Sequence, residues 1–82
     1  VEASSRRGVE VRTRLALSRF TPRSVVVWVD GGSPGLWICR MRVTVERGVR
    51  VELEEAGDEP MAAVERAVER AARQLDRRRA LG

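Results

Sequence analysis

The segment "LWICRMRVTVERGVRVELE", residues 36–54, alternates apolar and polar side chains along most of its length. Successive side chains of a β-strand point to opposite faces of a sheet, so the pattern predicts strands with one apolar face. Arg47-Gly48 interrupts the alternation and suits a two-residue turn between antiparallel strands at residues 36–46 and 49–54. We expect the apolar face of this hairpin to carry Trp37, Cys39, Met41, Val43, Val45, Val49, Val51 and Leu53.

A third strand is predicted immediately before the hairpin. Residues 24–30, "SVVVWVD", are rich in β-branched side chains, which pack well on a pleated sheet. The loop "GGSPG", residues 31–35, connects this run to the hairpin through turn-forming residues. The three strands together predict an antiparallel meander with one apolar face and one polar face that bears Arg40 and Arg42.

Residues 60–79, "PMAAVERAVERAARQLDRRR", have the spacing of an amphipathic helix. Asp58 or Glu59 can cap its start, and Pro60 is tolerated in a first turn. One side of this helix is apolar and should cover the apolar face of the sheet, through Met61, Val64, Val68, Ala71, Ala72 and Leu75. The opposite side carries Arg66, Arg70, Arg73 and Arg77.

The N-terminal quarter is less regular. Residues 9–20, "VEVRTRLALSRF", alternate like a strand from Val9 to Leu17, but Val9, Thr13 and Phe20 also fall on one helical stripe. Both alternatives remain open, because the two periodicities fit about equally well. Residues 1–8 are polar and predict a loose tail or a short edge strand. The 82 residues are expected to form one domain, residues 1–82, of the α+β class.

The composition favours a binding protein over an enzyme. The chain contains no histidine, and its single cysteine, Cys39, is expected on the buried face as an unreactive thiol. No cluster of metal-ligating residues is present, and "GGSPG" lacks the lysine of a phosphate loop. We therefore expect no catalytic residue, metal, cofactor or small-molecule substrate. The sequence shows no membrane-length apolar run and no signal peptide, so a cytoplasmic protein that contacts no membrane is expected.

The charge is unevenly distributed along the chain. All 16 basic residues are arginine, and the net charge is +4. Residues 1–42 hold eight arginines against three acids, whereas residues 43–82 hold eight against nine. The helix arginines are compatible with a solvated face or with phosphate contacts. Since Phe20, Trp28 and Trp37 are the only aromatics, contact with RNA would involve its backbone rather than stacked bases.

Over residues 14–79 the chain resembles the ribosome hibernation-promoting factor and ribosome-associated inhibitor family. The resemblance rests on an ordered set of segments: "ALSRF", a valine-rich strand ending in aspartate, a glycine- and proline-containing loop, "CRMRVTV", "RVELEE" and "EPMAAVERAVERAARQLDRRR". It implies a two-layer β-α-β-β-β-α fold with two helices on one face of the sheet. It further implies a ribosome-associated stress-response factor that binds the 16S rRNA backbone of the small ribosomal subunit near the decoding region and silences translation.

The resemblance also implies which arginines bind RNA. Basic positions of the family's final helix correspond here to Arg70, Arg73 and Arg77, and those of its first helix correspond loosely to Arg14 and Arg19. Arg78 adds a further cation beside them. Two departures from the family are that the first helix is expected to be short and that Met61 replaces the usual aromatic residue.

Two other interpretations are compatible with the sequence. One is a non-enzymatic protein-interaction or assembly module that uses the exposed sheet face, and a homodimer is also compatible with the chain. The other is a double-stranded-RNA-binding domain, which shares a helix, three strands and a helix. The basic start of that domain's second helix is missing, because Asp58, Glu59 and Pro60 stand at this position.

Overall fold

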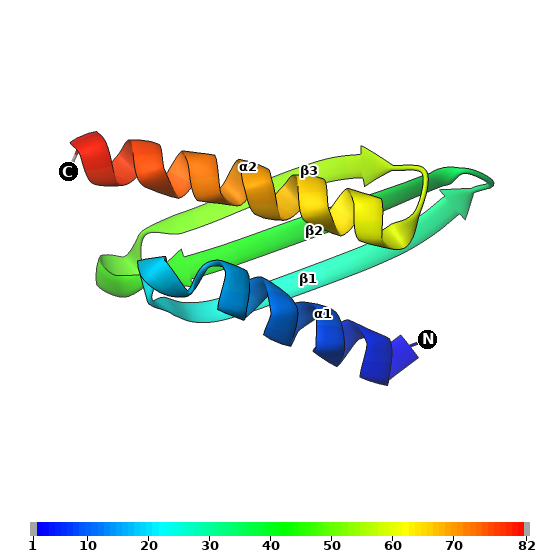
Figure 1. The fold of residues 1–82 in the computed structure, drawn as a ribbon, viewed down its shortest axis with the longest axis horizontal. Helices are drawn as coiled ribbons and strands as arrows, with labels where there is room; N and C mark the ends of the chain where they lie inside the picture. The colour runs from blue at the N-terminus through cyan, green and yellow to red at the C-terminus, as the bar shows by residue number, and fades with distance from the viewer. Residues whose placement is uncertain (1, 82) are drawn as a thin grey trace.

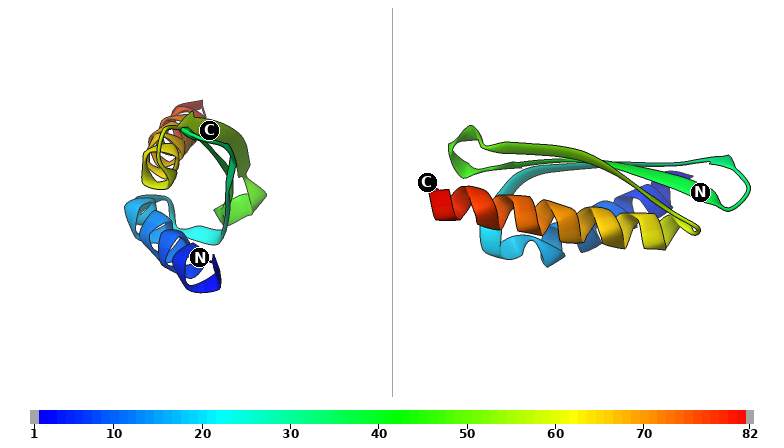
Figure 2. Two further views of the ribbon diagram at one scale, coloured as in Figure 1. Left: turned by 90° about the vertical axis from the view of Figure 1, so that its right-hand side faces the viewer. Right: turned by 90° about the horizontal axis from the view of Figure 1, so that it is seen from above.

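The computed structural model describes the backbone of residues 2–81 and the side chains of residues 8–80. The elements in chain order are helix α1 (Glu2–Ala16), the 3-10 turn η1 (Ser18–Phe20), strand β1 (Pro22–Ser33), strand β2 (Leu36–Val45), the 3-10 turn η2 (Glu46–Gly48), strand β3 (Arg50–Gly57) and helix α2 (Pro60–Leu81). Both helices lie on one face of the sheet, and the other face is uncovered (Figures 1 and 2). The predicted α+β class and two-layer arrangement are confirmed.

The sheet is an antiparallel meander in the order β1-β2-β3, as predicted. Val27 of β1 pairs with Met41 of β2, which in turn pairs with Leu53 of β3, so three apolar side chains share one row on the inner face. The buried core between sheet and helices consists of Leu17, Phe20, Val25, Val27, Cys39, Met41, Val43, Val45, Val51, Ala63, Val64, Ala67, Ala71 and Leu75.

The N-terminal region is helical, which decides between the two alternatives for residues 9–20. Helix α1 runs to Ala16 and is followed by η1. Thr13 and Leu17 are buried, whereas Val11 and Leu15 are exposed, so burial follows the helical and not the strand period. Because α1 begins at Glu2, the prediction of a tail or edge strand at residues 1–8 is wrong for residues 2–8. The order over residues 2–81 is therefore α-β-β-β-α, without the leading strand that the family resemblance implies.

Helix side chains also bind the backbone at both edges of the sheet. Along β1, the Glu10 carboxylate accepts a hydrogen bond from the Val27 N–H at 3.4 Å, and Arg14 donates to the Pro22 carbonyl at 3.1 Å. Along β3, Arg66 donates to the Ala56 carbonyl at 3.3 Å. An uncovered strand edge is open to pairing with another chain, and these contacts occupy part of each edge.

Helix α2 lies close to the end of β3. The side chains of Ala63, Ala67 and Ala71 are fully buried against the sheet. A Cβ atom built on Gly57 would lie 2.6 Å from the backbone nitrogen of Ala63, closer than real Cβ contacts allow. Glycine at the end of β3 therefore permits the first turn of α2 to fold back tightly over the sheet.

Replacing Gly57 by alanine should destabilise the fold. The added methyl would meet backbone rather than a movable side chain, so α2 must shift, at a cost of roughly 1–3 kcal/mol in the free energy of unfolding. Gly32→Ala is the matched control, because nothing lies within 4 Å of a Cβ at that position. Urea denaturation of both variants measures the difference. Equal stabilities would show that the close approach at Gly57 does not constrain the fold.

Cys39 is buried at the centre of the sheet, as the alternation predicted. Burial disfavours the charged thiolate and raises the pKa of the Cys39 thiol to about 11. The thiol therefore stays protonated through neutral pH, and we expect it to react with an aromatic disulfide reagent at pH 8 only after denaturation. Absorbance of the released thiolate in native and denatured samples checks this, and rapid reaction of the native protein would contradict it.

Candidate nucleic-acid interface

Charge is separated along the long axis of the molecule. The end of α1, the connection between β2 and β3 and the C-terminal half of α2 lie together at one end (Figure 1). We call residues 14–23, 46–50 and 73–79 the basic end. Nine arginines belong to it, namely Arg14, Arg19, Arg23, Arg47, Arg50, Arg73, Arg77, Arg78 and Arg79. Glu46 and Asp76 are the carboxylates in the same three segments.

The opposite end of the molecule is acidic. The end of β3 and the start of α2 carry Glu54, Glu55, Asp58 and Glu59, with no arginine within residues 54–59. This end lies beside the turn between β1 and β2, away from the C-terminus of α2 (Figure 1). The net charge of +4 therefore understates the positive charge that the basic end presents.

Two arginines of the basic end stack on one aromatic ring. The Arg19 guanidinium lies 4.5 Å and that of Arg79 lies 5.6 Å from the centroid of the Phe20 ring. Arg19 also forms an ion pair with Asp76 of α2, with 2.8 Å between nitrogen and oxygen. The buried Phe20 ring therefore helps to hold arginines from η1 and α2 near each other.

Several other arginines at this end have no protein partner. Among the side chains of residues 8–80, Arg47, Arg73, Arg77 and Arg78 form no ion pair or hydrogen bond. Arg73 forms none even with Glu69, four residues earlier on the same helix. These guanidinium groups have their hydrogen-bond donors available for an external anion.

Arg70 is separated from the other predicted RNA-binding residues. Its guanidinium forms an ion pair with Glu55 at 2.8 Å and donates to the Glu54 carbonyl at 3.5 Å, so it binds the edge of β3. The physical reason is the rotation of α2. Ala63, Ala67 and Ala71 face the sheet, which places Arg66 and Arg70 at the side of the helix rather than opposite the buried line.

The structure thus brings five of the six predicted residues to the basic end: Arg14, Arg19, Arg73, Arg77 and Arg78. The Arg14 guanidinium bonds the carbonyl of Pro22, whereas Arg73, Arg77 and Arg78 are unpaired within the described side chains. The sequence did not single out Arg47 or Arg79 as site residues. Arg79 could have been found from its place in the run of basic residues 77–79. No local sequence pattern indicated that the turn at Arg47 would lie near that run in the fold.

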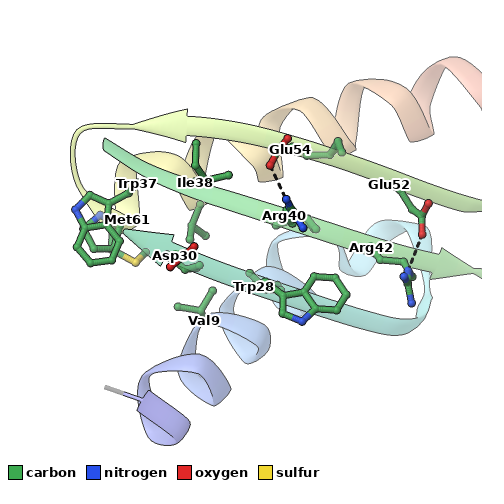
Figure 3. A pocket seen from close by; sticks show the side chains of 16 residues that line it. Val9, Trp28, Asp30, Trp37, Ile38, Arg40, Arg42, Glu52, Glu54 and Met61 are labelled. Carbon is green, nitrogen blue, oxygen red and sulfur yellow. Dashed lines mark hydrogen bonds and ion pairs between the residues drawn. The ribbon is translucent and has the colours of Figure 1, made fainter. Parts of the chain in front are cut away.

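The uncovered face of the sheet is electrically balanced. Arg40 pairs with Glu54 at 3.0 Å and Arg42 with Glu52 at 2.7 Å, each across the β2–β3 ladder (Figure 3). The Arg42 guanidinium also lies 5.5 Å from the ring centroid of Trp28, whose side chain is exposed. These two arginines are therefore already neutralised and do not extend the positive charge of the basic end.

Comparisons with known proteins return no match to a family model, to a curated protein or to a solved structure. Within residues 2–81, neither helix carries an apolar run of the length that a bilayer requires. The same residues contain no grouping of cysteine and acidic side chains that could hold a metal ion.

Proposed function

We propose that this protein is a non-catalytic factor that binds the phosphate backbone of small-subunit rRNA through its basic end. The observation that carries the proposal is the convergence of nine arginines from three separate segments, against two carboxylates. Guanidinium groups bind phosphate oxygens through a rigid fork of donors, which suits contact with nucleic-acid backbone. Six of these arginines have no ion pair, hydrogen bond or ring contact among the described side chains, so binding through them would not first require breaking an ion pair.

The charge separation also restricts how an RNA could be approached. Phosphate is attracted to the basic end and is repelled by Asp58 and Glu59 at the other end, where Glu54 and Glu55 are paired with Arg40 and Arg70. The protein would therefore enter an RNA cleft with the C-terminal end of α2 first, rather than lie along a duplex. Trp28, the exposed aromatic, is on the uncovered face of the sheet, so base stacking does not contribute at the basic end.

The resemblance to hibernation-promoting factors supports the choice of RNA target. It suggests the decoding region of the small subunit, where occupancy of the tRNA and mRNA path would block translation without any chemical step. Such a stress-response role requires binding alone, and the placement of charge at one end of the molecule is sufficient for it.

Double-stranded-RNA-binding domains share the order helix, three strands, helix with residues 2–81. Their second helix begins with basic residues, whereas α2 begins next to Asp58 and Glu59 and carries its unpaired arginines at the other end. The basic surface is therefore at the opposite end of the helix from the one that such a domain uses. This polarity favours the small-subunit proposal.

A protein-interaction module is the second candidate, because Trp28 is exposed on a sheet face that neither helix covers (Figure 2).

The salt dependence of binding distinguishes the two functions. Phosphate binding should weaken by about 0.7–0.9 logarithmic units per contact for each tenfold rise in salt. Apolar association through the sheet face should change little over the same range.

Removing three unpaired arginines should abolish most binding to small ribosomal subunits. The test variant is Arg73→Gln/Arg77→Gln/Arg78→Gln, and the control is Arg12→Gln/Arg66→Gln/Arg70→Gln, which loses the same charge outside the basic end. At a fixed salt concentration between about 50 and 200 mM, we expect the test variant to bind roughly 100-fold or more weakly than the wild-type protein. The control should bind less than about tenfold more weakly than the wild-type protein.

Co-sedimentation with purified small subunits over a salt series provides the measurement, with circular dichroism to confirm that both variants are folded. Equal losses in the two variants would show that only net charge matters and would reject the basic end as the interface. Salt-insensitive binding would favour the sheet face and a protein partner. No sedimentation of the wild-type chain at low salt would reject the small subunit as the target.

A further inference from the structure

A shallow hollow opens at the basic end between η1, the connection from β2 to β3 and the last turns of α2. Its rim includes Arg19, Arg47, Arg78 and Arg79, and apolar side chains that include Phe20, Val45, Val49 and Leu75 form its floor. We call this hollow the arginine notch. We propose that the notch is a phosphate-binding subsite that seats one phosphate group of the RNA backbone, with Arg47 as a principal contact. This inference rests on the proposed function and assigns a specific position within that interface.

The charges that line the notch favour a single anion. Four guanidinium groups from three different elements surround the hollow, and Glu46 is the one carboxylate among its lining residues. Arg47 and Arg78 have no ion pair or hydrogen bond among the described side chains. A run of cations at a helix C-terminus also offsets the helix dipole. That effect does not account for Arg19 and Arg47, because neither belongs to α2.

Part of the notch is held in place before any ligand binds. The ion pair with Asp76 and the contact with the Phe20 ring fix Arg19, and the same ring lies under Arg79. Side chains that are already ordered lose less conformational entropy when they bind an anion. The Arg19–Asp76 pair still leaves other guanidinium donors of Arg19 free, since only one nitrogen is bonded.

The backbone at Arg47 gives an independent reason to assign it a role. Its φ angle is 67°, and the following Gly48 has a φ angle of 75°, so both residues adopt the left-handed backbone conformation. Glycine and asparagine adopt this conformation readily, but a long side chain does so at an energetic cost. An arginine here is therefore a poor choice for the turn itself, and strained positions of this kind concentrate at functional sites. Its side chain lines the notch.

The test separates stability from binding at one residue. Arg47→Asn should raise the midpoint of urea denaturation, because asparagine tolerates the left-handed backbone. The same variant should bind a labelled RNA hairpin about five- to tenfold more weakly, with a salt slope smaller by about 0.7–0.9. Arg12→Gln is the matched control, because it removes the same charge from an exposed side chain of α1 outside both the notch and the basic end, and it should weaken binding by about twofold or less.

A purely structural role for Arg47 would not give this combination. Such a role predicts lower stability in Arg47→Asn, with RNA affinity changing no more than in Arg12→Gln. Equal RNA affinities of the two variants would overturn the subsite, even if the wild-type protein binds RNA in a salt-sensitive way. That outcome would leave the proposed function of the basic end in place.

Inorganic phosphate distinguishes a general anion site from one that needs RNA. NMR spectra of the arginine Nε–Hε groups, recorded during a phosphate titration, should show saturable shifts for Arg47 and Arg79. Shifts together with RNA binding that depends on Arg47 support a subsite that also accepts free phosphate. Dependence on Arg47 without shifts supports a subsite that requires the RNA backbone. If neither the NMR shifts nor the dependence of RNA binding on Arg47 is seen, the inference is overturned. If the wild-type chain does not bind RNA, the phosphate titration alone decides whether the notch binds phosphate.

Discussion

The need to bury one apolar face of the sheet is the constraint on which the rest of this structure depends. A three-stranded meander carries its apolar side chains on one face, and within residues 2–81 the two helices bury them. Helix α2 does so by folding back directly after β3, where Gly57 allows the backbone of Ala63 to approach closely. Its path then carries its C-terminus to the connection between β2 and β3 (Figure 1).

The separation of charge follows from that path. The acidic segment, residues 54–59, must lie where the sheet ends and α2 begins, and the arginines of residues 73–79 must lie at the far end of the helix. Helix α1 ends on the same side, so η1 brings Arg19 and Phe20 against α2. A chain of modest net charge thus folds into a molecule with one strongly basic end.

Some arginines of this chain have partners within the protein, and others have none among the described side chains. Arg14, Arg66 and Arg70 bond backbone carbonyls at the edges of the sheet, and Arg40 and Arg42 pair with glutamates across it. The planar guanidinium, with several donors, is suited to both carbonyl and phosphate acceptors. A count of arginines therefore overestimates the surface available to RNA. The proposed interface therefore rests on the unpaired side chains and not on the basic composition as such.

The sequence by itself determined the three strands, the span of α2 and the burial of Cys39, because side-chain alternation and helical spacing are local properties of the chain. Only the tertiary structure decided that residues 2–16 are helical, since strand and helix patterns overlapped there until burial of Thr13 and Leu17 separated them. It also moved Arg70 to the edge of β3, because packing of the small alanines set the rotation of α2. Finally, it placed Arg47 and Arg79 around the same hollow, because the packing of the sheet against the helix brings together residues that are distant in sequence, and no local pattern encodes that packing.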